Sequence, residues 1–109
     1  MAYSKQLRDA LDPLLMPLDG VSGRAMFGAH CYLVDGKMFV IVMGDEFVLK
    51  PAYGDEHALR NQFSAAPWSH RPGQTFGRFM SVPVHEGVDL TTLSPFFENA
   101  HAARQREPR

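Results

Sequence analysis

Apolar residues dominate residues 24–50, where they form three runs separated by two turn dipeptides. Asp35-Gly36 suits a two-residue type I′ turn, because both central residues of that turn need positive φ. Gly44-Asp45 suits a second two-residue turn, of type II′. Residues 24–50 are therefore expected to form a three-stranded antiparallel meander.

Two-residue turns also determine which residues lie opposite each other in neighbouring strands. The first turn predicts the pairs Val34 with Lys37, Tyr32 with Phe39, and His30 with Ile41. The second turn predicts the pairs Met43 with Glu46, Ile41 with Val48, and Val40 with Leu49.

Since side chains alternate along a strand, this register gives the meander two different faces. One face is wholly apolar and is expected to be the core face, carrying Phe27, Ala29, Cys31, Leu33, Met38, Val40, Val42, Phe47 and Leu49. The other is an apolar stripe rimmed by the polar residues His30, Lys37, Glu46 and Lys50. Such a stripe exceeds what a solvated sheet face normally exposes. We expect a protein interface there, most simply a homodimer contact, formed by Tyr32, Phe39, Ile41, Met43 and Val48, with Val34 beside them.

Helical spacing appears at both ends of the chain. Ser4 is an expected N-cap, followed by a stripe of Leu7, Leu11, Leu14, Leu15 and Leu18, and Pro13 predicts a kink or a restart. Near the other end, Asp89, Thr91 or Thr92 is expected to cap a helix whose stripe is Leu90, Leu93, Phe96, Phe97, Ala100 and Ala103. The charged residues 105–109 are expected to fray.

The middle of the chain is less regular. Asp55 is expected to cap a short helix, and residues 66–73 read as a loop that Trp68 pins to the sheet. Residues 75–82 are expected to form a further strand, anchored by Phe79. The interpretation is a single domain, residues 1–109, of the α+β class. It has two layers, with helices covering an antiparallel sheet made of a three-strand meander and at least one further strand.

Composition narrows the classes of function. The formal net charge of −1 makes a nucleic-acid binder less favoured, although Arg60, Arg71 and Arg78 with His70 offer a local basic patch. A single cysteine suits a reducing compartment. Neither an apolar run long enough to span a bilayer nor a secretory leader is legible, so a cytoplasmic protein without membrane contact is expected.

Residue chemistry indicates no catalytic set, and we expect no enzyme activity, cofactor or metal. The five histidines, His30, His57, His70, His85 and His101, have no ligand-pair spacing. Cys31 is expected to be buried and inert. Arg24 is expected to pair with Asp45, Glu46 or Asp55, or else to grip an anion, and Gly28 is expected to relieve a bulge or a close backbone approach.

A spaced motif carries a family resemblance. It consists of Arg24-x-Met26-Phe27-Gly28, then Asp35-Gly36-Lys37-Met38-Phe39, then Leu49-Lys50. Together with Phe63, Pro67-Trp68, Phe79, Val82-Pro83 and the closing helix, this motif resembles the N-terminal domain of TfoX/Sxy-type competence regulators. Ala29 and Cys31 stand where members usually have glycine, and Phe97 where they usually have tryptophan.

The resemblance implies an α+β fold similar to secretion-chaperone-like proteins and a role in regulation, not catalysis. It also implies a transcription-regulator partner, since full-length members carry a second helical domain and work with a cyclic-AMP-responsive activator. A second resemblance is to the MmcQ/YjbR-like group, small α/β domains for which nucleic-acid contacts would be expected. A third possibility is a ligand-binding or enzymatic module with a pocket near Trp68, lined by Arg24, His70 and Tyr32.

Overall fold

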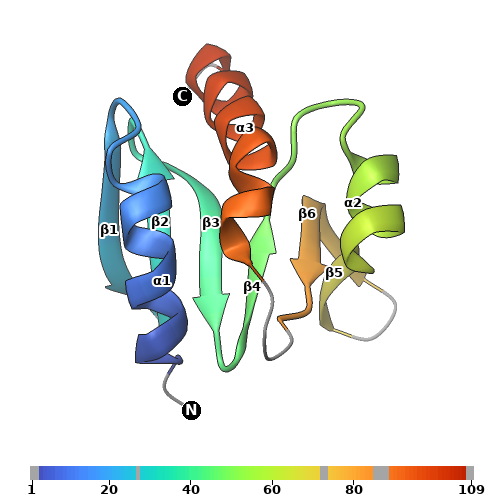
Figure 1. Cartoon of the computed structure of the whole chain (residues 1–109), viewed down its shortest axis with the longest axis horizontal. Coiled ribbons are helices and arrows are strands. Elements are labelled where there is room, and N and C mark those ends of the chain that lie inside the picture. The colour runs from blue at the N-terminus through green and yellow to red at the C-terminus, as the bar shows by residue number, and fades with distance from the viewer. Residues whose placement is uncertain (1–2, 27, 72–73, 85–88, 108–109) are drawn as a thin grey trace.

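A computed structural model describes residues 3–26, 28–71, 74–84 and 89–107, without the side chains of residues 69–71 and 74–77. The elements in chain order are α1 (Lys5–Leu15), β1 (Val21–Met26), β2 (Ala29–Val34), β3 (Lys37–Met43), β4 (Glu46–Leu49), α2 (Glu56–Phe63), β5 (Ala66–Arg71), β6 (Gln74–Val82), the 3-10 helix η1 (Leu90–Leu93) and α3 (Ser94–Arg106). Figure 1 shows this arrangement.

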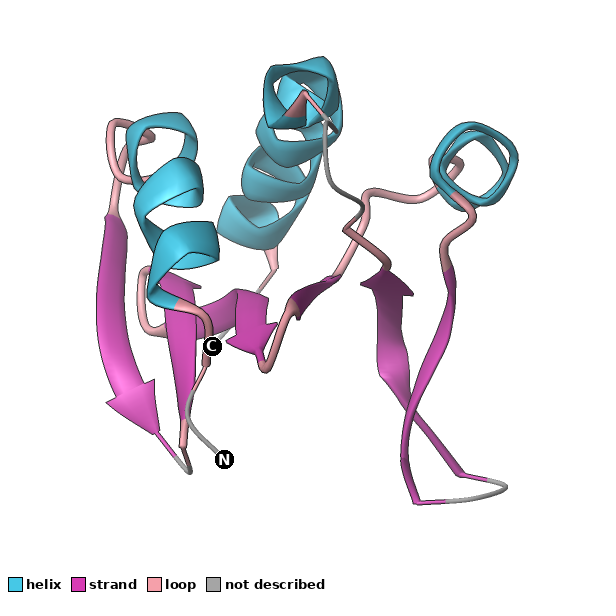
Figure 2. Cartoon of the chain, turned by 60° about the horizontal axis from the view of Figure 1, so that its bottom comes forward, coloured by secondary structure: helices cyan, strands magenta, loops and turns pink. Residues whose placement is uncertain are grey.

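The strands form one antiparallel sheet in the order β1-β2-β3-β4-β6-β5. Figure 2 shows α1, α2 and α3 on the same side of this sheet. The expected α+β class and the packing of helices against an antiparallel sheet are confirmed. The sheet has six strands, in agreement with the expected meander and at least one further strand.

Local sequence explains where the helices begin and end. The Ser4 side chain accepts a hydrogen bond from the Leu7 amide at 3.1 Å, which confirms the expected N-cap of α1. Helix α1 continues through Pro13 to Leu15 without restarting. Pro13 is exposed and lies in the last turn, on the solvent side of the helix. Asp89 caps η1 by accepting from the Thr91 amide at 3.0 Å, and Pro95 lies in the first turn of α3, where proline is tolerated.

The main core lies between the helices and the sheet. Its fully buried large side chains are Tyr32, Phe39, Phe47, Phe97, Leu11, Leu15, Leu49, Leu59, Leu93, Val34, Val40 and Val42. Burying a side chain of this size contributes roughly 1.5–3 kcal/mol, so this layer supplies most of the driving force for folding.

Three expectations about the elements are wrong. The first expected strand is a hairpin, β1 and β2, which turns at Gly28 with φ 78°. Gly28 therefore supplies the positive φ of a turn and does not relieve a bulge. Residues 66–71 form β5 and not a loop, and α3 continues to Arg106, so residues 105 and 106 do not fray.

The register of the meander is confirmed near its turns and wrong beyond a bulge. Asp35 and Gly36 both have positive φ, 51° and 82°, and Val34 lies opposite Lys37 as expected. The pairing then shifts by one residue between Tyr32 and Leu33. The partners observed beyond the shift are Tyr32 with Val40 and His30 with Val42, where Phe39 and Ile41 had been expected. All three expected pairs between β3 and β4 are observed.

The bulge changes the faces of the sheet, because one extra residue reverses the alternation of side chains. Tyr32, Val34 and Phe39 belong to the core under the helices, not to the expected interface stripe. Conversely, Ala29, Cys31, Leu33 and Met38 lie on the opposite face, not on the expected core face. Phe27 falls outside the described residues.

Candidate functional site

A second apolar cluster occupies the sheet face on which no helix packs. We call it the helix-free face and define it by buried Ala29, Cys31, Leu33, Ile41, Val48 and Phe79 with half-buried Met26, Met38, Met43 and Trp68 around them. No residue of α1, α2 or α3 belongs to this cluster, whereas the core under the helices draws on all of them. Figure 2 shows the three helices on the other side of the sheet.

Methionine sets the chemical character of the rim of the helix-free face. Met26 comes from β1, Met38 and Met43 come from β3, and Trp68 packs against the same cluster from β5. The thioether side chain is flexible and polarisable, and such side chains are over-used on binding surfaces that adapt to their partners. The expected packing of Trp68 against the sheet is confirmed, although Trp68 lies in strand β5 and not in a loop.

The five residues expected to form one interface are divided between the two faces. Ile41, Met43 and Val48 lie on the helix-free face, but Val48 and Ile41 are buried there, with 0% and 6% exposure. Tyr32 and Phe39 are both 0% exposed beneath the helices. The expected contact through Phe39, Ile41 and Met43 side by side is therefore wrong.

Arg24 is exposed on β1 and lies opposite Cys31 of β2, which places both on the helix-free side of the sheet. The ion pairs among the described residues do not include Arg24, so the expected pair with Asp45, Glu46 or Asp55 is not observed. Burial raises the pKa of the Cys31 thiol, and the positive charge of Arg24 opposes that rise. Cys31 is 3% exposed and behaves as a small hydrophobic residue, as expected.

Two lysines of the family motif hold the end of α3. The Lys37 ammonium donates to the backbone oxygens of Arg104, at 2.6 Å, and of Glu107. Lys50 lies 3.5 Å from the Glu107 carboxylate, which also pairs with Arg104. Cations suit a helix C-terminus, where the last carbonyls are unpaired and the macrodipole is negative. These motif positions therefore have a structural explanation.

A polar cluster that sequence reasoning missed lies between α1 and β2. The Tyr32 hydroxyl donates to Asp12 at 2.5 Å, and Arg8 Nε lies 3.8 Å from the same carboxylate. The His30 ring stands edge-on to Tyr32, with 4.9 Å between ring centroids. Burial, followed by the charge of Arg8, lowers the pKa of His30 against the opposing effect of Asp12. Helical periodicity did not indicate this contact, because Asp12 lies outside the apolar stripe of α1.

One arginine of the expected basic patch, Arg78, is neutralised by a carboxylate. The Arg78 guanidinium lies 2.8 Å from the Glu56 carboxylate and 3.8 Å from the centroid of the Tyr53 ring. Arg60 is exposed on α2, and the side chains of His70 and Arg71 are outside the description. Arg78 is thus held in an ion pair with a cation–π contact, and Arg60 alone does not make a basic patch, which gives little support to direct nucleic-acid binding.

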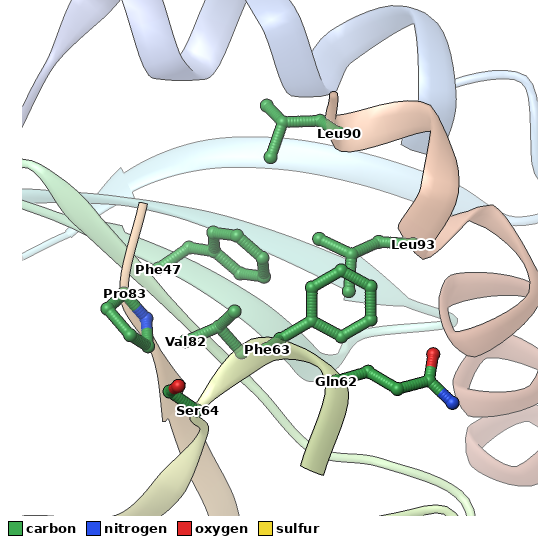
Figure 3. A pocket seen from close by; sticks show the side chains of 8 residues that line it. All are labelled: Phe47, Gln62, Phe63, Ser64, Val82, Pro83, Leu90 and Leu93. Atoms are coloured by element: carbon green, nitrogen blue, oxygen red, sulfur yellow. The ribbon is translucent and has the colours of Figure 1, made fainter. Parts of the chain in front are cut away.

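A pocket of about 100 Å³ opens between α2, β4, β6 and η1 (Figure 3). Its lining is mostly apolar and consists of Phe47, Gln62, Phe63, Ser64, Val82, Pro83, Leu90 and Leu93. Ligand pockets usually measure about 300–1,000 Å³, so this one suits a very small group at most. The expected pocket near Trp68 is not supported, since Arg24 and Tyr32 lie on opposite faces of the sheet.

The histidines are dispersed. His57 contacts Asn61 on α2, His101 contacts the Asp19 carbonyl, and His30 packs between Tyr3 and Tyr32. Across the described residues, no group of three or more histidine, cysteine, aspartate or glutamate side chains is placed to hold a metal ion. His85 lies outside that part of the chain. The helices that the structure describes include none with the length and apolar character needed to cross a bilayer.

Comparison with known proteins identifies the family. The model of the TfoX N-terminal domain matches residues 13–103, which is most of the 109-residue chain. No curated protein and no solved structure matches the chain significantly. The matched range begins inside α1 and ends inside α3, so it contains the whole sheet and the lysines that hold α3.

Proposed function

Because this chain belongs to the TfoX N-terminal domain family, we propose that it is a non-enzymatic regulatory domain acting through contact with another protein. The family membership supports a regulatory type of domain. The partner that this membership favours is a transcription regulator, and the site of action that we propose is the cytoplasm.

The observation that carries the proposal is the helix-free face. Three half-buried methionines and Trp68 surround a buried apolar centre there, and none of the described helices contributes to this cluster. Protein interfaces combine an apolar centre with a polar rim and are enriched in methionine and aromatic residues. Arg24 and Glu46 are exposed and supply both signs of charge near this face.

Genetic complementation tests the proposal. The gene is deleted from the organism that carries it, and wild type or a variant is then reintroduced. We expect deletion to change transcript levels and wild type to restore them. Met43→Lys places a charge at the rim of the helix-free face and should fail to restore them. Met16→Lys is the matched control, since Met16 is 44% exposed at the end of α1, on the helix side. Folding of both variants is checked by thermal unfolding.

Two results would contradict the proposal. Full restoration by Met43→Lys would show that the rim of the helix-free face is dispensable. A catalytic turnover of the purified protein, abolished by Arg24→Ala, would show that the domain is an enzyme.

A further inference from the structure

The first strand lies at an open edge of the sheet. In the strand order of the described chain, β1 has β2 on one side and no strand on the other. Residues 22–25 are all exposed, whereas most of β2 is buried. An edge of this kind presents unpaired backbone groups that can pair with another strand.

Hydrogen-bond parity shows which backbone groups of β1 point outward. The Asp35 amide donates to the Gly20 carbonyl at 3.1 Å, and Gly20 and Asp35 continue the register of β1 with β2. Hydrogen-bonded pairs recur at every second residue of an antiparallel ladder, so Ser22, Arg24 and Met26 bond to β2. The backbone amides and carbonyls of Val21, Gly23 and Ala25 therefore point away from β2, toward the open edge of the sheet. The Val21 amide donates to the Leu18 carbonyl, in agreement with this parity.

The opposite edge of the sheet is less suited to pairing. Its strand, β5, contains Pro67, which has no amide hydrogen, and its register with β6 is interrupted at two places. Prolines and bulges are common means of blocking an edge strand. Strand β1 contains no proline, shows no register shift against β2, and has a single charged residue, Arg24.

We propose that β1 pairs in antiparallel orientation with β1 of a second copy, about a two-fold axis that passes through Gly23 perpendicular to the sheet. This axis aligns the outward backbone groups of both strands. The Gly23 amide of each copy donates to the Gly23 carbonyl of the other, and the Ala25 amide of each copy donates to the Val21 carbonyl of the other. This axis also pairs residues 21–25, which is all of the strand except Met26. An axis through Arg24 would let the outward groups of Gly23 bond to those of Ala25, but it would set two guanidinium groups side by side.

Self-complementarity favours a second copy as the occupant of this edge. With the axis at Gly23, each Arg24 lies opposite Ser22 of the other copy, so the only charge of the strand meets a hydroxyl. Gly23 has no side chain to collide at the axis. Because a perpendicular two-fold axis keeps each face of the sheet on its own side, the two helix-free faces become continuous.

The first test removes one outward amide. Analytical ultracentrifugation of wild type should show a dimer that dissociates on dilution. Ala25→Pro deletes the outward amide and leaves the bonds to β2, so it should shift the protein to monomer. Ala25→Ser is the matched control, because it keeps the amide and should dimerise as wild type does. A wild type that is monomeric at every concentration, or a folded Ala25→Pro variant that dimerises normally, overturns the proposal.

Hydrogen exchange of the backbone amides is a second test. It uses only the wild-type protein, so it does not require any variant to fold. Protection of Gly23 and Ala25 should rise with protein concentration, while Ser22 and Arg24 stay protected throughout. Concentration-independent exchange at Gly23 and Ala25 overturns the proposal.

The register is tested by charge. Ser22→Glu places a carboxylate opposite Arg24 twice per dimer and should tighten the dimer roughly two- to thirty-fold, whereas Ser22→Arg should weaken it by a similar factor. Equal shifts in both variants would mean that these residues are not opposite each other, and the axis at Gly23 would be wrong. This inference goes beyond the proposed function: Met43→Lys should leave the dimer intact, so the two can fail separately.

Discussion

The Tyr32 hydroxyl donates a hydrogen bond of 2.5 Å to Asp12 and joins β2 to α1 across 20 residues of sequence. Tyr32 itself is 0% exposed, so its ring packs in the main core while its hydroxyl reaches the partly exposed face of the helix. Burial, followed by the hydrogen bond to Asp12, raises the pKa of Tyr32 well above its ordinary value of 10.

This raised pKa predicts a loss of stability in alkali that depends on Tyr32. The neutral phenol is favoured in the folded chain, so its contribution is complete below about pH 10 and decreases as pH rises above that value, where the unfolded chain ionises first. Tyr32→Phe should cost about 0.5–1.5 kcal/mol at neutral pH, because one hydrogen bond is lost. The difference between wild type and variant should shrink above about pH 10 in urea unfolding.

Tyr53→Phe is the control, because Tyr53 is 79% exposed and the variant keeps the ring that faces Arg78. Its cost should stay within about 0.5 kcal/mol. A Tyr32→Phe difference that stays constant into alkali would contradict the link between the buried hydroxyl and stability.

Two glycines offer a matched comparison of backbone strain with and without a collision. Gly20 and Gly36 have positive φ, 75° and 82°. A Cβ on Gly20 would lie 2.5 Å from Asp35 Oδ1, whereas one on Gly36 would meet nothing within 4 Å. Gly36→Ala should therefore cost about 1–2 kcal/mol from strain alone, and Gly20→Ala should cost slightly more, because the exposed Asp35 side chain must also rotate away. Equal melting temperatures for the two variants would argue against the collision.

Local signals predicted most of the elements but not the faces of the sheet. The dipeptides Asp35-Gly36 and Gly44-Asp45 specify their turns chemically, and the pairs beside them are observed. The bulge near Tyr32 has no such signature in the sequence. A single extra residue reverses the alternation, so Tyr32, Val34 and Phe39 were assigned to the correct strands and to the wrong side, whereas Val40, Val42, Phe47 and Leu49 lie on the expected core face.

Other differences arise from tertiary contacts. Residues 66–71 contain two turn formers, Pro67 and Ser69, yet pairing with β6 makes them an edge strand. The last residues of α3 looked like a fraying tail, but Lys37 and Lys50 hold them from the sheet. Contacts between residues so far apart in sequence leave no mark in local periodicity.

The candidate surface was predicted in part. Met43 and Ile41 do lie on the side of the sheet that the helices leave uncovered, but Met26 and Met38 had not been assigned to the expected interface. The open edge at β1 was missed, because the expected meander began at Arg24 and the turn at Gly28 had not been recognised.

The corrected faces predict different costs for two neighbouring truncations on β3. Phe39 is fully buried under α3, where its ring lies 6.4 Å from that of His101. Phe39→Ala should destabilise the protein by about 3–5 kcal/mol, as for other buried aromatic residues. Met43→Ala, at the half-buried rim of the helix-free face, should cost clearly less. Chemical denaturation measures both, and the reverse order would contradict the assignment of the faces.

The last prediction concerns acid and the end of α3. Burial acts to raise the pKa of Glu107, but the hydrogen bond from Arg104 and the charges of Arg104 and Lys50 outweigh it, so the pKa lies below its ordinary value of 4.5. A lowered carboxyl pKa stabilises the folded state at neutral pH, and this contribution is lost as pH falls through the folded pKa.

Glu107→Gln should therefore cost up to about 1 kcal/mol at neutral pH, the usual range for a pair that remains partly solvated. The difference from wild type should decrease as pH falls below 4.5, where the wild-type carboxyl becomes protonated in both states. Glu98→Gln on the exposed side of the same helix is the control, and its difference from wild type should be small throughout. Urea unfolding across the acid range measures both variants. A Glu107→Gln cost that persists unchanged in acid would mean that packing of the side chain, and not its charge, holds the end of α3 against Lys50.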